Sequence, residues 1–176
     1  MKTFLTLFVL LFSFNSYGGW FDKTVCVETD AQDRNGIIFL PNQTEPFTGN
    51  NLCEYENGQV KSKGEIKDGK KNEKWINWHE NGQIKSEGNF KDGKKDGKLT
   101  LWFENGQIRS EEHYKDDKKV AETRYAYYAN GQIEYKVKKK EMKDYPKDGK
   151  STWWYENGLM KEESNFKDGN YDGKFT

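Results

Sequence analysis

Polar and apolar residues alternate along most of the chain, in short stretches that are separated by glycine-containing dipeptides. Asn-Gly between β-prone stretches is typical of a two-residue hairpin turn, in which both residues adopt positive φ. The dipeptide recurs at steps of 24, 24, 25 and 27 residues. The pattern therefore predicts about five tandem β-hairpins. The dipeptides are Asn57-Gly58, Asn81-Gly82, Asn105-Gly106, Asn130-Gly131 and Asn157-Gly158.

A two-residue turn would fix which side chains face one another across each hairpin. The residue two before Asn should face the residue three after it, and each such pair matches a ring with an aliphatic side chain. Because side chains alternate between faces along a strand, Gly88 and Phe90 share this apolar face, and rings of neighbouring strands have room to lie across Gly64 and Gly88. The pairs are Tyr55 with Val60, His79 with Ile84, Phe103 with Ile108, Tyr128 with Ile133 and Tyr155 with Met160.

A second marker, Lys-Asp-Gly, follows most hairpins. We expect the connection after the second hairpin to turn at Lys94-Lys95, because that register pairs Phe90 with Leu99 and preserves the apolar face. The fourth hairpin departs from the pattern and places Lys139 on the apolar face. The marker begins at Lys67, Lys91, Lys147 and Lys167, and it decays to Lys115-Asp116-Asp117 in the third repeat.

Aromatic residues also recur on the opposite, nominally polar face. The position three before Asn holds Trp78, Trp102, Tyr127 and Trp154 in the last four hairpins. Trp, Tyr and Arg dominate the energetics of protein interfaces, so this column and its cations form the candidate partner-binding face. The alternative is that lysine stems simply cover the rings, as in many stable sheets. In the predicted register the cations across from the three tryptophans are Lys85, Arg109 and Lys161.

The first residues have the layout of a secretory signal peptide. Lys2 precedes an apolar or hydroxyl-bearing run from Phe4 to Phe14, and the small residues Ser16 and Gly18 follow at the positions that a signal peptidase reads. The run is too short for a spanning helix, although an uncleaved membrane anchor is the alternative. We expect residues 1–18 to be removed and the mature protein to be periplasmic, displayed on the outer surface or secreted.

The two ends of the mature chain differ from the repeats. Residues 19–48 are predicted to cap the array, since terminal units of repeat proteins are usually atypical. In this segment Ile37 to Leu40 is predicted to be a strand, with Thr24 to Thr29 as its partner. The repeats occupy residues 49–176, and Asp172 to Thr176 begins a sixth unit, which is either a final pairing strand or a truncated repeat.

Cys26 and Cys53 both survive the predicted cleavage. In an exported chain they are candidates for one disulfide, with two buried free thiols as the alternative. Closing a loop of about 28 residues would stabilise the fold by about 3 kcal/mol in the chain-entropy model.

Composition and motifs indicate binding rather than catalysis. The 29 basic and 29 acidic residues balance, which argues against capture of nucleic acid or of an acidic membrane. The two cysteines and two histidines lack metal-ligand spacing, and no catalytic triad or phosphate loop is present. We therefore expect no enzymatic activity, no metal and no cofactor.

The stretch from Trp78 to Lys98 and the parallel run from Trp154 to Lys174 resemble the bacterial MORN-repeat variant family. The resemblance covers about Phe47 to Thr176. It implies consecutive β-hairpins in an elongated sheet and no catalytic site. Many bacterial proteins of this kind are labelled YwqK family antitoxin, by similarity to a neutralising partner of a toxin.

These features predict an all-β protein, an elongated antiparallel sheet of tandem MORN-like β-hairpin repeats behind a cleaved signal peptide. We expect a non-enzymatic scaffold that binds another protein in the cell envelope or outside the cell. The first alternative is an antitoxin or immunity protein that neutralises a toxin by binding it. The second is a module that binds glycans or a lipid surface, although the balanced charge does not favour an anionic membrane.

Overall fold

The structure is a computed structural model that describes residues 23–140 and 148–172. Within these residues the chain forms strands and no helices. The predicted signal peptide lies outside the described residues, as does the end of the predicted sixth unit beyond Asp172. The strands are β1 (Thr24–Val25), β2 (Gln32–Arg34), β3 (Ile37–Phe39), β4 (Gly49–Glu54), β5 (Val60–Lys67), β6 (Lys70–Trp78), β7 (Ile84–Lys91), β8 (Lys94–Trp102), β9 (Ile108–Lys115), β10 (Lys118–Tyr127), β11 (Ile133–Lys140), β12 (Asp148–Trp154), β13 (Met160–Lys167) and β14 (Asn170–Tyr171).

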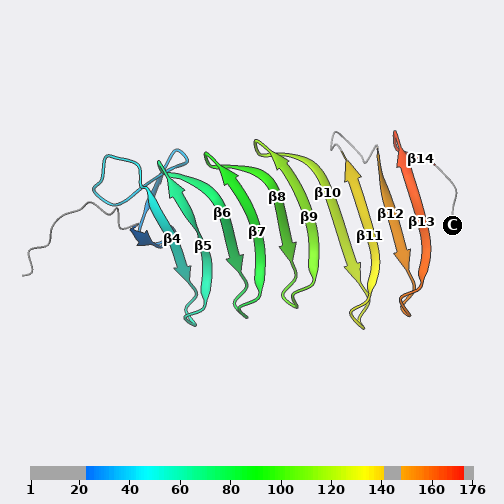
Figure 1. The fold of residues 1–176 in the computed structure, drawn as a ribbon. Coiled ribbons are helices and arrows are strands. Elements are labelled where there is room, and N and C mark those ends of the chain that lie inside the picture. Colours follow the sequence, from blue (N-terminus) through cyan, green and yellow to red (C-terminus); the bar gives the residue numbers. More distant parts are fainter. Residues whose placement is uncertain (1–22, 141–147, 173–176) are drawn as a thin grey trace, which may run out of the picture.

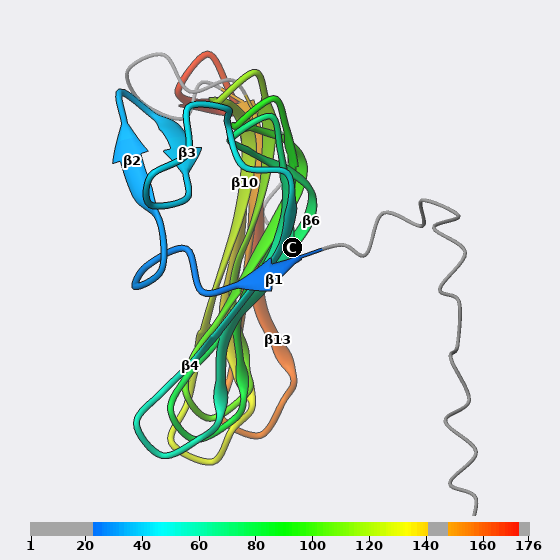
Figure 2. The same ribbon diagram turned by 90° about the vertical axis from the view of Figure 1, so that its left-hand side faces the viewer.

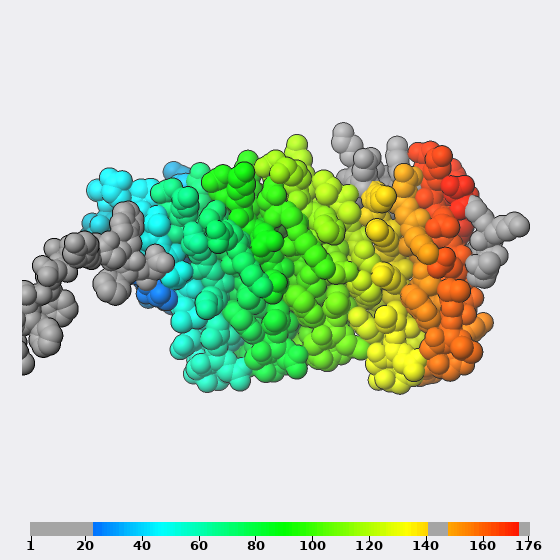
Figure 3. Space-filling view, in the orientation of Figure 1, coloured from blue at the N-terminus to red at the C-terminus, as the bar shows by residue number. Residues whose placement is uncertain are grey.

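Twelve strands form one sheet, in which β4 to β14 follow one another in chain order (Figure 1). All of these neighbours are antiparallel, whereas β1 pairs with β4 in parallel. The Asn-Gly turns line the lower edge of the sheet in Figure 1. The space-filling view shows the hairpins as successive bands, each beside its neighbours in sequence (Figure 3). The predicted all-β sheet of five tandem hairpins is therefore confirmed.

The Asn-Gly turns are one residue longer than predicted. In the first turn the Gly58 N–H donates to the Tyr55 carbonyl at 2.9 Å and the Tyr55 N–H donates to the Gln59 carbonyl at 2.8 Å. Gly58 has a φ of 80°, but Asn57 is not among the residues with positive φ. The Asn57 side chain instead accepts the Gln59 N–H on Oδ1 at 3.0 Å. This is the three-residue hairpin loop with a glycine bulge, and the same bonds recur in the other four turns.

The two-residue turns lie at the opposite edge of the sheet. Asp92 and Gly93 have φ values of 51° and 85°, and they connect Lys91 to its direct partner Lys94. The prediction of a turn at Lys94-Lys95 was therefore wrong. Phe90 pairs with Lys95, and Leu99 pairs with Gly88. Both residues also have positive φ in the pairs Asp68-Gly69, Asp116-Asp117 and Asp168-Gly169.

Each hairpin also has a β-bulge next to its Asn-Gly turn, where one residue of the second strand has no partner. Trp78 pairs with Ile84 while Asn77 pairs with Ser86, so Lys85 has no partner in β6. A bulge adds one residue to one strand, and here it moves Ile84 from the face of His79 to the face of Trp78. The predicted ring–aliphatic pairs across the hairpin were therefore wrong. The same shift occurs in the other four hairpins.

Residues 23–48 pack on one face of the first hairpins, which we call the capped face (Figure 2). Phe47, Ile66 and Trp75 form the buried hydrophobic core there. Ile38 donates its N–H to the Gly69 carbonyl at 2.8 Å. Val25, Val27, Ile38, Leu40 and Phe90 surround the core.

The strand pairing inside the N-terminal segment differs from the prediction. β3 pairs with β2 through the two-residue turn Asn35-Gly36, because a tight turn brings the nearer strand into register first. Thr24 and Val25 pair instead with Asn50 and Asn51 of β4. The predicted pairing of Thr24–Thr29 with Ile37–Leu40 was wrong.

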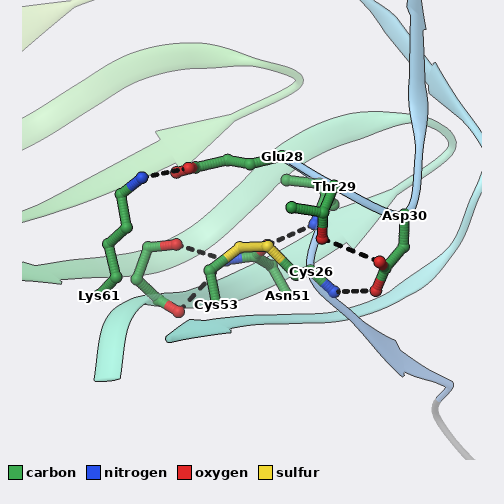
Figure 4. Close-up of a disulfide and its surroundings, with 9 residues drawn as sticks. Cys26, Glu28, Thr29, Asp30, Asn51, Cys53 and Lys61 are labelled. Carbon is green, nitrogen blue, oxygen red and sulfur yellow. Dashed lines mark hydrogen bonds and ion pairs between the residues drawn. A yellow bond between two sulfur atoms is a disulfide. The ribbon is translucent and has the colours of Figure 1, made fainter. Parts of the chain in front are cut away.

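The predicted disulfide between Cys26 and Cys53 is confirmed (Figure 4). Asn51 lies beside it and is fully buried. Its Oδ1 accepts the Val27 N–H at 3.0 Å, and its Nδ2 donates to the Ser62 hydroxyl at 2.9 Å. One covalent bond and a buried amide thus hold the N-terminal segment on the first hairpin.

Candidate functional site

The three predicted tryptophans lie on the face opposite the N-terminal segment. Trp78, Trp102 and Trp154 are half-buried, and their direct partners across the hairpin are aliphatic. No other described segment lies over this face (Figure 2). We call this row of six residues the tryptophan stripe: Trp78 with Ile84, Trp102 with Ile108, and Trp154 with Met160.

Tyr127 occupies the matching position in the fourth hairpin and pairs with Ile133, but its ring is held differently. Its hydroxyl donates to the Ile108 carbonyl at 2.9 Å. The ring meets Phe103 edge-on, with centroids 6.5 Å apart. Tyr127 is therefore engaged within the sheet and is not part of the stripe.

The predicted cations do not lie across from the tryptophans. They occupy the unpaired bulge position, and the side chains of Arg109 and Lys161 lie beside residues of the capped face. Lys161 Nζ is 5.8 Å from the centroid of the Tyr155 ring. Lys61, at the same repeat position, forms an ion pair with Glu28 of the N-terminal segment. The prediction that Lys85, Arg109 and Lys161 accompany the tryptophan column was wrong, because the bulge separates these residues from it.

Rings on the capped face join the first hairpin to the second, the second to the third, and the fourth to the fifth. The Tyr55 hydroxyl donates to the Trp78 carbonyl at 2.6 Å, and the Tyr128 hydroxyl donates to the Trp154 carbonyl at 2.7 Å. His79 Nε2 lies 3.2 Å from the Trp102 carbonyl, so this histidine takes the place of a tyrosine. Residue spacing alone did not indicate these bonds, since the acceptor is a backbone atom 23 to 26 residues away.

Ion pairs between neighbouring strands border the tryptophan stripe. Lys74 pairs with Glu87 at 2.8 Å and Lys150 pairs with Glu163 at 2.7 Å. The third pair joins Lys98 to Glu111. The hydrogen bond from Lys98 lowers the pKa of Glu111, although burial opposes this shift. The stripe thus has an apolar centre and a charged rim, which is the usual anatomy of a protein interface.

The capped face carries a buried charged cluster between the third and fourth hairpins. Glu112 and Glu122 are 6% and 2% exposed. Lys119 Nζ lies 2.7 Å from Glu112 Oε1 and 3.4 Å from Glu122 Oε1. Arg124 Nε lies 2.9 Å from Glu122 Oε1, and the Tyr114 hydroxyl donates to Glu112 Oε2 at 2.7 Å.

Glu122 is ionised in this cluster. Burial raises its pKa, but the hydrogen bond from Arg124 and the charges of Lys119 and Arg124 outweigh burial and hold the pKa below its usual value. Glu122 Oε2 is buried and has no hydrogen-bond partner within the described residues. Sequence reasoning missed this cluster, although extending the alternation from Leu99 to its partner Glu112 would have placed a carboxylate on the apolar face.

A cavity of about 550 Å³ opens over this cluster on the capped face. Phe103 and Tyr135 contribute rings to its wall. Arg109, one of the predicted partner-binding residues, lines it together with Arg124. The polar hollow lies where the third and fourth hairpins meet, whereas the buried hydrophobic core lies at the first two hairpins.

Residues 23–140 and 148–172 contain no group of three or more His, Cys, Asp or Glu side chains that could hold a metal ion. None of their secondary structure is a helix with the length and apolar character needed to cross a membrane.

Comparison with known families matches four segments of the chain to the model of the MORN repeat variant. The matched residues are 48–68, 74–92, 95–116 and 147–168. They correspond to the first, second, third and fifth hairpins, while the unmatched fourth hairpin still forms as β10 and β11. A comparison with curated proteins returned no match.

Proposed function

Because this chain belongs to the MORN repeat variant family, we propose that it is an exported scaffold that binds a protein partner through the tryptophan stripe. The observation that carries the proposal is the stripe itself. Trp78, Trp102 and Trp154 recur with aliphatic partners on a face that no described segment covers. Exposed apolar side chains bordered by polar residues are typical of protein interaction sites.

The exposure of the stripe supports a partner rather than a core. Ile84 is 36% exposed and Met160 is 53% exposed, so a partner that covers them removes apolar area from water. Tryptophans at the centre of an interface commonly contribute more than about 2 kcal/mol each. The repeat spacing presents these anchors in a row, which suits an extended segment of a partner.

The disulfide supports the export part of the proposal. Disulfides form and persist in oxidising compartments, and Cys26–Cys53 joins two segments of this chain. We propose that residues 1–18 direct export and are cleaved after Gly18. Mass spectrometry of the protein expressed from its full sequence tests this directly. A mature chain that begins at Gly19 and resists thiol alkylation supports export, whereas an intact Met1 with two reactive thiols would refute it.

Affinity capture tests the binding part of the proposal. The mature chain is immobilised and exposed to envelope extract, alongside a Trp102→Ser/Trp154→Ser variant. Leu101→Ser is the matched control, because Leu101 is equally half-buried but faces the capped side. Circular dichroism and thermal melting establish that each variant is folded.

We expect wild type and Leu101→Ser to retain the partner and the double variant to lose it. Equal capture by the folded double variant would overturn the assignment of the stripe. If the retained molecule is a toxin and the chain blocks its activity, the chain acts as an antitoxin that binds through the stripe. Retention of a glycan instead of a protein would contradict the proposal.

A further inference from the structure

We propose that the cavity between the third and fourth hairpins binds an acidic peptide segment, with Arg109 and Arg124 holding a carboxylate of that segment. The cavity opens on the capped face, whereas the tryptophan stripe lies on the other face. The two sites are therefore separate, and this inference stands whether or not the stripe binds a partner.

Both arginine side chains have hydrogen-bond donors that bind no described residue. Arg124 uses Nε to contact Glu122, and no bond involves its terminal nitrogens within the described residues; its side chain is 54% exposed. Arg109 is exposed and makes no hydrogen bond or ion pair with any described residue. Arg124 pairs directly with Ser110, the neighbour of Arg109, so the two side chains line one wall of the cavity. A planar guanidinium binds a carboxylate through two parallel hydrogen bonds.

The carboxylates beneath the cavity do not repel an anion. Glu112 accepts from Lys119 and from the Tyr114 hydroxyl. Glu122 is paired with Lys119 and Arg124. Three cations and two carboxylates line the cavity, which leaves an excess positive charge although the whole chain is balanced.

The remaining wall identifies a peptide rather than a simple ion. Glu122 Oε2 is a buried acceptor without a partner, and a buried polar atom gains most from a new donor. A peptide supplies N–H donors close to its side-chain carboxylate, whereas a fully ionised inorganic anion such as sulfate supplies no donor. Phe103 is 39% exposed, and its ring offers an apolar surface for the methylene groups of a glutamate.

The irregularity of the array explains why the site lies here. The bulge position holds lysine in the first, second and fifth hairpins, and Lys61 is already paired with Glu28. Only the third hairpin has arginine at that position. The cavity volume of about 550 Å³ is large enough for several side chains of a bound segment.

Fluorescence anisotropy of a fluorescein-labelled hexaglutamate peptide tests the inference on the mature full-length chain at low salt. The variants are Arg109→Gln, Arg109→Lys and Arg124→Gln. Lys136→Gln is the charge-matched control. The Lys136 side chain lies on the face of the tryptophan stripe, on strand β11, and its Nζ is 5.4 Å from the centroid of the Tyr125 ring. A labelled hexaglutamine peptide and competition by inorganic phosphate complete the design.

We expect the wild type to bind hexaglutamate and not hexaglutamine. Arg109→Gln and Arg124→Gln should each weaken binding about tenfold or more, the effect of losing a hydrogen bond to a charged group. The affinity of Arg109→Lys for hexaglutamate should fall between those of wild type and Arg109→Gln. Lysine keeps the positive charge but cannot form the two parallel hydrogen bonds of a guanidinium. Lys136→Gln should change binding by less than about twofold, as for an exposed charge.

Three results would overturn the inference: no binding of hexaglutamate, an equal loss in Lys136→Gln and Arg109→Gln, or competition by phosphate as effective as by unlabelled peptide. Arg109 is exposed and its side chain makes no hydrogen bond or ion pair with the described residues, so Arg109→Gln remains decisive if Arg124→Gln is unstable. Trp102→Ser should leave peptide binding unchanged, which separates this site from the tryptophan stripe.

Discussion

The Tyr55 hydroxyl donates a hydrogen bond to the Trp78 carbonyl, and this 2.6 Å contact joins the first hairpin to the second. The tyrosine crosses the intervening strand β5 and reaches the backbone where the bulge begins. Equivalent rings make the same contact at the second and fourth hairpins. A single-layer sheet with few buried hydrophobic residues thus gains a polar contact between repeats in addition to its strand pairing.

Tyr55→Phe should lower the free energy of unfolding by about 0.5–1.5 kcal/mol, because it removes one hydrogen bond and keeps the ring. Tyr155→Phe is the control. Tyr155 has the same repeat position and is 50% exposed, but its hydroxyl makes no hydrogen bond within the described residues. Urea denaturation followed by circular dichroism measures both variants. Equal losses in the two variants would show that the hydroxyl contact does not stabilise the array.

Asparagine amides form a second connection between turns. Asn81 Nδ2 donates to the Glu104 carbonyl of the next turn at 2.7 Å, whereas Asn105 Nδ2 donates only to Gln107 of its own turn. Both side chains accept a backbone N–H on Oδ1, which Asp would still do. Asn81→Asp should therefore destabilise the protein by about 0.5–1.5 kcal/mol more than Asn105→Asp. Thermal melting of the two variants distinguishes them, and identical melting temperatures would contradict the account.

Gly64 provides space for the core tryptophan. A Cβ atom at Gly64 would lie 2.3 Å from Trp75 Cδ2, whereas one at Gly88 would meet the flexible end of Leu99 at 2.8 Å. Gly64→Ala should cost about 1–3 kcal/mol, the range for overpacking a core. Gly88→Ala should cost less, because Leu99 can change rotamer. Denaturant unfolding that gives the reverse order would show that Trp75 is not fixed across Gly64.

The Lys98–Glu111 pair makes stability depend on pH in the acid range. The pKa of Glu111 is lowered from its usual 4.5 in the folded state, so its contribution is complete above the unfolded value and is lost as pH falls through the folded value. Near neutral pH, Glu111→Gln should be less stable than wild type by roughly 0.5–1 kcal/mol. Below pH 4.5 the difference should shrink. Unfolding curves that stay equally separated from pH 7 to pH 3 would contradict this assignment.

Spacing was sufficient to predict the sheet, because an Asn-Gly pair every 24 to 27 residues dictates one hairpin per repeat. It did not predict the loop length. Asn and Gly are compatible with both a two-residue and a three-residue loop, and the choice depends on the hydrogen bonds of residues such as Tyr55 and Gln59. Asp-Gly pairs of the Lys-Asp-Gly marker, such as Asp92-Gly93, form two-residue turns.

One added residue accounts for the main error in the predicted site. The bulge shifts Ile84 to the face of Trp78 and leaves Lys85 unpaired, so a column that was predicted to be aromatic and cationic is aromatic and aliphatic. Alternation arguments fail at bulges because the period of two is interrupted there. The disulfide was predicted from two cysteines in a chain that is expected to be exported, whereas the Glu112–Glu122 cluster depends on side chains from two hairpins.

Footprinting of the complex with the captured partner shows which face of the sheet the partner covers. We propose that the tryptophans form the contact surface and that the bulge cations lie on the other side. Hydroxyl-radical oxidation reports on Trp78 and Trp102, and acylation reports on Lys85 and Lys161. We expect the partner to protect both tryptophans while both lysines react as fast as in the free protein. Protection of the lysines with unchanged oxidation of the tryptophans would contradict the account.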